Sequence, residues 1–359
     1  MLRAYRRTGA DLPFGDPRGY HGTGFEGYFW RFTDAPRGTV IIVLAGVNRD
    51  DRGGTWGTVG LAAHPGGLVR DAAVGHARAA ATGIEISAGD GAGVHLQAGD
   101  DRVDVRLGGD RLHVRLDGHV PWPRRALGGV GLGHVIPGLS QYWHPHLLGG
   151  RATGFAVLGG RRVDLDGVEV YAEKNWGPGG FPDAWWWGQA QGFDRPDVCV
   201  AFAGGHATLG GVGARATSLV VRLGDEVHQV VRPLLPLRVD VGRDGWRLTG
   251  RTPWHRLEVE GHANGSAPHL LPVPLPAQRR HLPAAATQHL AGHLRLTVRR
   301  GRRLVYTGET AFAGLERGST FGDVEPASLP GGAGRRKGQR FRRDEPLERR
   351  DREPQGTQA

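Results

Sequence analysis

Short runs in which apolar and polar residues alternate recur along most of this chain, bounded by glycine, aspartate and proline. In the clearest run, Val103, Val105 and Leu107 share one face and the charged residues between them point the other way. A period of two places successive side chains on opposite faces of a strand. The Gly-Gly-Asp sequence at 108–110 predicts a hairpin turn, after which the same alternation resumes.

Comparable patterns predict strands in four further stretches, at 38–47, 218–231, 246–261 and 293–312. Only one stretch, LVRDAAVGHARAAATG at 68–83, has the spacing of a helix. Many antiparallel strands with little helix are typical of a β-barrel or β-sandwich, and the length favours two such domains in tandem. The sequence therefore predicts an all-β fold.

Composition agrees with many short strands joined by tight turns, because the chain has 61 glycines and 23 prolines, and glycine weakens helices. A long region of apolar alternation is followed by a terminal segment with almost no apolar residues to bury, which predicts disorder. The expected organisation is an irregular segment at 1–20, a first β-domain at 21–160, a second at 161–325 and a disordered basic tail at 326–359.

The formal net charge of +10 does not indicate a nucleic-acid partner, because outside the tail the basic residues are dispersed and form no stripe. The single cysteine, Cys199, excludes an internal disulfide and lies in an apolar run typical of a buried residue. The amino-terminal residues contain no apolar signal-peptide region, and no run reaches the roughly 20 apolar residues of a membrane span. We expect a cytoplasmic protein, with peripheral membrane contact and the oligomeric state left open.

The most aromatic segment, YAEKNWGPGGFPDAWWWGQAQGF, begins at Tyr171 and carries charges that packing alone does not explain. As a strand, it places Tyr171, Glu173 and Asn175 on one face, and Lys174 and Trp176 on the other. Charged groups are seldom fully buried without a partner. Glu173 could therefore be neutralised by Lys174, or it could be protonated and act as a proton donor near pH 7.

After the turn, the returning strand places Trp185, Trp187 and Gln189 on one face and mostly small residues on the other. A face that mixes tryptophan with glutamine resembles the lining of a cavity more than a packed core. Two further stretches have the same character, 140–155 and 25–32, and their candidate lining residues are Tyr142, Trp143, His144, His146, Glu26 and Trp30.

Other chemistries find little support in the sequence. His144 and His146 could supply two metal ligands, but no third ligand lies at a diagnostic spacing. The sequence GGVGLG at 128–133 is not followed by a helical pattern, which argues against a phosphate-binding loop. The sequence GLSQY at 138–142 lacks the second glycine of a nucleophile elbow. We therefore expect no metal and no cofactor.

Four blocks in this chain, QYWHPHLLGGRATG, YAEKNWG followed by FPDAWWWGQAQGF, FEGYFWRF and FAGLERG, resemble the tocopherol cyclase family. The chain is also similar, more distantly, to carotenoid 1,2-hydratases. The resemblance implies a lipocalin-like, two-domain β architecture and a role in vitamin E-type prenylquinone chemistry. It implies closure of a prenylated hydroquinone to a chromanol by protonation of the prenyl double bond, with no redox change and no cofactor. The plant-type transit segment is absent, as expected of a bacterial protein.

The resemblance also assigns roles to the candidate residues. Glu173 is the expected proton donor, and the aromatic faces of Trp176, Trp185 and Trp187 would stabilise the developing cation. The remaining catalytic candidates are Tyr171, Asn175 and His144, and the remaining substrate-binding candidates are Gln189, Tyr142, Trp143, His146, Glu26 and Trp30. Two alternatives stay open: hydration of a carotenoid or terpenoid double bond, and a non-catalytic carrier of a lipophilic isoprenoid.

Overall fold

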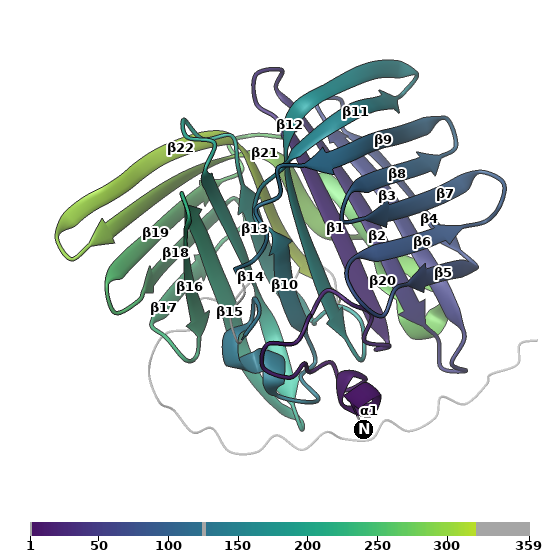
Figure 1. The fold of residues 1–359 in the computed structure, drawn as a ribbon, viewed down its shortest axis with the longest axis horizontal. Coiled ribbons are helices and arrows are strands. Elements are labelled where there is room, and N and C mark those ends of the chain that lie inside the picture. The colour runs from purple at the N-terminus through teal and green to yellow at the C-terminus, as the bar shows by residue number, and fades with distance from the viewer. Residues whose placement is uncertain (1, 124–126, 321–359) are drawn as a thin grey trace, which may run out of the picture. The chain divides into compact units, whose positions relative to one another are not determined.

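Two large antiparallel sheets make up the computed structural model, which describes residues 2–123 and 127–320 (Figure 1). The first sheet contains β1 (Phe25–Asp34), β2 (Thr39–Arg49), β3 (Thr55–His64), β4 (Leu68–Val74), β5 (His76–Ala79), β6 (Glu85–Gly89), β7 (Val94–Gly99), β8 (Arg102–Leu107), β9 (Asp110–Asp117), β10 (Tyr142–Leu147), β11 (Arg151–Leu158) and β12 (Arg161–Gly177). The second contains β13 (Ala184–Ala190), β14 (Val198–Leu209), β15 (Val212–Leu223), β16 (Glu226–Arg232), β17 (Leu237–Val241), β18 (Gly245–Arg251), β19 (His255–His262), β20 (His269–Leu275), β21 (Arg280–Arg300) and β22 (Arg303–Ser319).

Helix is limited, in the described residues, to α1 (Leu2–Arg6) and two 3₁₀ turns, η1 (Gly131–Val135) and η2 (Pro276–Gln278). None of these has the length and apolar character that crossing a membrane requires. The prediction of an all-β, lipocalin-like architecture with little helix is confirmed.

The predicted helix at 68–83 is wrong. The segment forms β4 and β5 instead, and pairing of β4 with β3 outweighs the helical spacing. Val74 and Ala77 contribute to the core of the first sheet from these strands.

The first sheet curls so that its terminal strand β5 returns to β3. Gly57 in β3 makes this approach possible, because a Cβ at this position would lie 3.0 Å from the Cβ of Ala77 in β5. The apolar faces of the alternating strands meet inside the curl, where Val103, Val105 and Leu107 are buried as the two-residue period predicts. The predicted hairpin is present as well, because β8 ends at Leu107 and β9 begins at Asp110.

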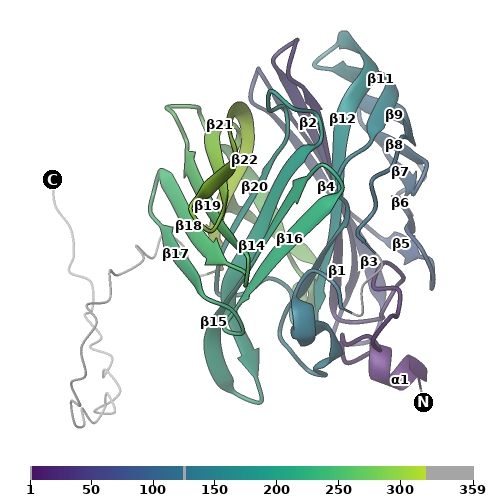
Figure 2. The same ribbon diagram turned by 60° about the vertical axis from the view of Figure 1, so that its left-hand side comes forward.

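The second sheet encloses its own apolar cluster, built from side chains such as Phe202, Leu219 and Trp246. Figure 2 shows this sheet beside the first. A third cluster joins the two sheets, because it contains Phe29 and Tyr171 from the first sheet together with side chains of the second.

Arg31 adds a polar link to this contact between the sheets. Its guanidinium is fully buried and donates hydrogen bonds to the carbonyl oxygens of Leu290, at 2.7 Å, and Phe312, at 2.8 Å. Burial lowers the pKa of Arg31 to about 9.

The chain passes from the first sheet to the second between Gly177 and Ala184, because β12 pairs with β1 and β11, whereas β13 pairs with β14 and β22. The two-domain division itself stays a prediction, and we propose this crossover as its boundary. The predicted tail at 326–359 lies outside the described residues.

Candidate active site

A cavity of about 690 Å³ is lined by residues of both sheets. Ligand pockets commonly have volumes of about 300–1,000 Å³, so this one can hold a lipophilic molecule of substantial size. Its lining is largely aromatic and aliphatic. The aromatic members are Phe25, Tyr28, Phe29, Tyr142, Trp143, Phe181, Trp185, Trp186 and Trp187. The acidic members are Asp71, Glu173 and Glu316.

Strand pairing explains why Glu173 and Asn175 reach this cavity. Both lie on one face of β12, which pairs with β1 so that Asn175 stands opposite Gly27. A Cβ at Gly27 would collide with the Asn175 side-chain oxygen, so glycine at this position makes room for the amide. The predicted alternation on β12 therefore agrees with the structure.

The Glu173 carboxyl is buried, with 7% of the residue exposed. Tyr171 donates a hydrogen bond to Glu173 Oε2 at 2.6 Å, and the indole nitrogen of Trp187 donates to the same oxygen at 2.9 Å. Burial raises the pKa of Glu173, and these hydrogen bonds act in the opposite direction. Tyr171 is itself buried, which raises its pKa well above the usual value and keeps the phenol protonated.

A second buried carboxyl, that of Glu316 on β22, faces the same cavity. It accepts hydrogen bonds on both oxygens, from the Trp185 indole to Oε1 at 2.6 Å and from Gln288 Nε2 to Oε2 at 3.0 Å. Burial raises its pKa to about 7, and the negative charge of Glu173 acts in the same direction. Sequence reasoning did not select Glu316, although the FAGLERG block that contains it was one of the motifs singled out.

Two glycines on either side of Glu316 allow the tryptophans of β13 to occupy their places. A Cβ at Gly318 would collide with the Trp185 ring, and one at Gly314 would lie 2.9 Å from the Trp187 ring. Strand β22 pairs with β13 in a register that sets Glu316 opposite Trp187. The glycines thus let the two indoles lie flat against β22, where each can donate to one of the two carboxyls.

Five buried polar atoms of cavity-lining residues have no hydrogen-bond partner among the described residues. They are the indole nitrogens of Trp143 and Trp186, the hydroxyls of Tyr28 and Thr217, and the Gln288 side-chain oxygen. Buried polar groups are nearly always paired, so unpaired ones around a cavity point to a ligand or water that completes them.

Lys174 does not neutralise Glu173, so one of the two alternatives for Glu173 is excluded. The Lys174 side chain lies on the other face of β12 and forms a fully buried ion pair with Glu26, with Nζ 2.8 Å from Oε2. Backbone N–H groups of His21 and Gly22 also donate to the Glu26 carboxylate. Opposed by burial, the ammonium of Lys174 and these donors lower the pKa of Glu26 to about 2. Glu26 is therefore an ionised structural anchor outside the cavity lining.

Trp176 shares this second face of β12 and does not line the cavity. Its ring is stacked on His21, with centroids 4.4 Å apart, and on Tyr142, at 5.5 Å. Lys174 Nζ lies 4.8 Å from the ring centroid. Tyr142 also reaches the cavity, and its hydroxyl donates to the Ile136 carbonyl at 2.6 Å. We therefore leave Trp176 out of the proposed site and retain Tyr142 as a lining residue.

The remaining predicted residues are also outside the cavity lining. His144 accepts a hydrogen bond from the Gly129 amide at 3.3 Å, and burial lowers its pKa well below the usual value. Gln189 contacts the sulfur of Cys199 at 3.8 Å, and burial raises the pKa of that thiol to about 12. His144 and Gln189 thus make their hydrogen bonds to neighbouring protein groups outside the cavity lining.

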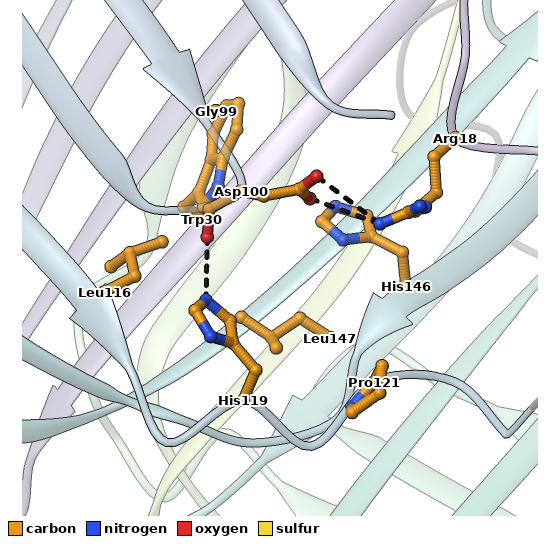
Figure 3. Close-up of a pocket in the computed structure, with 9 residues that line it drawn as sticks. All are labelled: Arg18, Trp30, Gly99, Asp100, Leu116, His119, Pro121, His146 and Leu147. Carbon is orange, nitrogen blue, oxygen red and sulfur yellow. Dashed lines mark hydrogen bonds and ion pairs between the residues drawn. The ribbon is translucent and has the colours of Figure 1, made fainter. Parts of the chain in front are cut away.

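His146 and Trp30 line a smaller cavity of about 200 Å³ near the ends of β7 and β9 (Figure 3). There His119 donates a hydrogen bond to the Asp100 carbonyl, and Arg18 pairs with the Asp100 carboxylate. Burial lowers the pKa of His146 to about 3, so the ring is neutral. The structure thus separates these two candidates from Glu173.

Within residues 2–123 and 127–320, one group of three side chains has the composition and spacing of a metal site. The ligand atoms of Glu226, His228 and His255 lie within 4.8 Å of one another, and none of the three lines the large cavity. We assign this group no part in the candidate active site.

Comparisons with known proteins agree with the architecture. Residues 129–319, more than half of the chain, match a family model described as tocopherol cyclase-like. Over 131 residues the chain is 29% identical to the chloroplastic tocopherol cyclase of Zea mays, a match that covers 35% of this chain and 27% of the maize protein. The chain therefore matches only about a quarter of that relative's length.

Solved structures share the fold at low sequence identity. The crystal structure of CghA with Sch210972 has a TM-score of 0.58 at 10% identity, covering 84% of this chain and 90% of that one. A Nitrosomonas europaea protein given the name AttH has a TM-score of 0.51 at 12% identity, covering 87% and 97%. These likenesses show the fold alone.

Proposed function

Because the chain belongs to the tocopherol cyclase-like family, we propose that it is a cyclase-type enzyme that closes a prenylated hydroquinone to a chromanol. The reaction is an isomerisation that begins with protonation of the prenyl double bond and involves no redox change. One observation carries the proposal: the buried carboxyl of Glu173 lies in the wall of a large aromatic cavity, where its pKa is raised by burial.

Glu173 is the proposed proton donor. Protonating an alkene requires a neutral acid in a site that excludes water. Tyr171 and Trp187 both donate to Oε2 of the carboxyl, so the acidic proton is expected on Oε1. The Tyr171 phenol also orients the carboxyl, since it is held protonated by its own burial.

Glu316 is the proposed proton acceptor. Both of its oxygens receive N–H donors, from Trp185 and Gln288, an arrangement that suits an ionised carboxylate. Two buried carboxyls that interact hold one proton between them more readily than none or two. In the proposed step, Glu173 gives its proton to an alkene carbon, the phenol oxygen bonds to the resulting cation, and the phenol proton passes to Glu316. Return of that proton from Glu316 to Glu173 restores the acid for the next turnover. A pKa near 7 is well matched to such a base.

Aromatic rings of the cavity would stabilise the tertiary cation. Trp185 and Trp187 line the cavity, and Phe29 packs edge-on against Trp187 with ring centroids 5.1 Å apart. A desolvated cation–π contact is worth about 2 kcal/mol, or roughly thirtyfold in rate for each well-placed ring. The Asn175 amide lies on the same lining and is available to the oxygen atoms of the quinol.

The decisive experiment combines Glu173→Gln with analysis of the product. Purified protein is incubated with a phytylated hydroquinone, and we expect a product of equal mass that no longer oxidises to a quinone. Glu173→Gln should lower its rate by at least about 100-fold, because general acid catalysis contributes about that much. Glu85→Gln, at an exposed position on β6, is the matched control and should keep the wild-type rate.

The alternatives give different results in the same assay. A product heavier by one water identifies a hydratase, in which water admitted to the cavity captures the cation. Tight retention of an isoprenoid without turnover identifies a carrier. Equal rates for Glu173→Gln and wild type would refute the assignment of the acid.

A further inference from the structure

Exposed apolar side chains are concentrated at the mouth of the large cavity. Twelve large hydrophobic side chains are exposed among the described residues, and five of them also line this cavity. These five define the apolar rim: Leu132, Ile136, Leu209, Val212 and Leu234. Single exposed apolar residues are ordinary on protein surfaces, but a contiguous group around a cavity usually marks a contact surface.

Three separate segments carry the rim, and direct contacts hold them together. The loop after η1 is joined to the end of β14 by hydrogen bonds between Ser140 and Thr208, at 3.0 and 2.8 Å. A Cβ at Gly131 would lie 3.2 Å from the Val231 side chain, so η1 also packs against the end of β16. Figures 1 and 2 both show η1 and the β14–β15 hairpin at the same end of the sheets.

The charged residues of the rim segments are arginines. The rim segments, 130–140, 203–217 and 230–236, contain no aspartate or glutamate, whereas they contain Arg215 and Arg232, both exposed. The amino-terminal segment is attached to η1, where the Tyr5 hydroxyl donates to the Val135 carbonyl at 2.7 Å. Apolar side chains flanked by arginines are the combination that binds an interface of acyl chains and phosphate groups.

We propose that the apolar rim inserts into the surface of a phospholipid bilayer and opens the large cavity to the lipid phase. Burial of Leu132, Val212 and Leu234 among acyl chains would supply the apolar part of the binding, and Arg215 and Arg232 would contact headgroup phosphates. A hydrophobic substrate would then enter the cavity without crossing water. The inference rests on the proposed function for the nature of that substrate, whereas binding to a bilayer can be measured with no substrate present.

Co-sedimentation with phospholipid vesicles tests the proposal. The protein is mixed with vesicles of phosphatidylcholine containing 30 mol% phosphatidylglycerol, an anionic lipid fraction on the order of that in natural anionic membranes. We expect wild-type protein to sediment with the vesicles. The double variant Val212→Asp/Leu234→Asp should bind about 100-fold more weakly, because burying each of the two side chains favours the bound state by about tenfold. Arg232→Gln should weaken binding about fivefold, and more at low salt than at high salt.

A matched control separates the rim from general surface hydrophobicity. Val305 is exposed to 43% on the β21–β22 hairpin and does not line the cavity, so Val305→Asp should leave vesicle binding unchanged. Far-UV circular dichroism and the thermal midpoint establish that each variant is folded. Equal binding by the rim variant and wild type, or no binding by either, would overturn the proposal. So would a wild-type dimer that the rim variant converts to monomers, because a second copy would then cover this surface.

Failure of this proposal is distinguishable from failure of the proposed function. Vesicle binding without turnover of any prenylquinol would support bilayer docking by the apolar rim and refute the proposed cyclase activity. Turnover of detergent-dispersed quinol without vesicle binding would support the cyclase activity and refute bilayer docking.

Discussion

Replacing Glu316 by glutamine should make the protein more stable at alkaline pH while impairing the proposed reaction. The substitution preserves the size of the side chain and removes its charge. Trp185 can still donate to the amide oxygen, as it does to Oε1 at 2.6 Å. The new amide group would face Gln288, whose own side-chain oxygen is buried without a partner. Rotation of the Gln288 amide would satisfy both groups, so the variant is expected to fold without an added unpaired atom.

The size of the effect follows from the shift of the Glu316 pKa from 4.5 to about 7. A carboxyl whose pKa is higher in the folded state binds its proton more tightly when folded. Its stabilising contribution is therefore complete below pH 4.5 and is lost as the pH rises through 7. The shift corresponds to about 3 kcal/mol of unfolding free energy, an order-of-magnitude value.

Urea unfolding at pH 5 and at pH 8 measures this effect. We expect the difference in unfolding free energy between Glu316→Gln and wild type to increase by about 2–3 kcal/mol from pH 5 to pH 8. Glu85→Gln, at an exposed position, should show no such change. Other titrating groups are common to all three proteins and cancel in the comparison. If this difference stays constant with pH within about 0.5 kcal/mol, the conclusion that burial raises the pKa of Glu316 to about 7 is refuted.

Two further substitutions test other parts of the structure. Glu26→Gln should lower the unfolding free energy at pH 7 by about 3–5 kcal/mol, because it leaves the buried Lys174 ammonium without its partner. Since the pKa of Glu26 is lowered from 4.5 to about 2, the wild-type advantage should shrink as the pH falls below 4.5 and be lost below about 2, and an undiminished difference at pH 3 would contradict the ion pair. Gly318→Ala should lower the unfolding free energy by about 1–3 kcal/mol, because its Cβ would displace the Trp185 ring. Gly109→Ala is the control, because a Cβ at Gly109 would meet open space, whereas Gly301 is unsuitable because its φ is positive. Gly109→Ala should lower the unfolding free energy less than Gly318→Ala in the same urea titration.

Local alternation predicted the strands around the candidate site well. Residues 168–176 are part of β12, and the faces assigned to Tyr171, Glu173 and Lys174 agree with the structure, because a period of two is fixed by the strand itself. The helix predicted at 68–83 was wrong because pairing with a neighbouring strand, which is not encoded locally, decided the outcome.

The partners of the buried charges could not be predicted in the same way. Lys174 is adjacent to Glu173 in sequence, yet its carboxylate partner is Glu26, nearly 150 residues away, because β1 and β12 pair. Glu316 reaches the cavity only through the register of β13 with β22. Both relationships depend on sheet order, and a single sequence contains no direct signal for which strands become neighbours.

The proton-transfer groups of the cavity and much of its apolar wall come from different parts of the chain. Both carboxyls and the tryptophans that hold them fall within the stretch matched by the family model, whereas much of the opposing apolar surface comes from β1 to β3, which precede that stretch. Catalysis and the shape of the substrate cavity therefore depend on different parts of the polypeptide. Exchanging side chains such as Leu44 could reshape the space offered to a new isoprenoid while the proton-handling groups keep their places, which gives directed evolution of this scaffold a natural starting point.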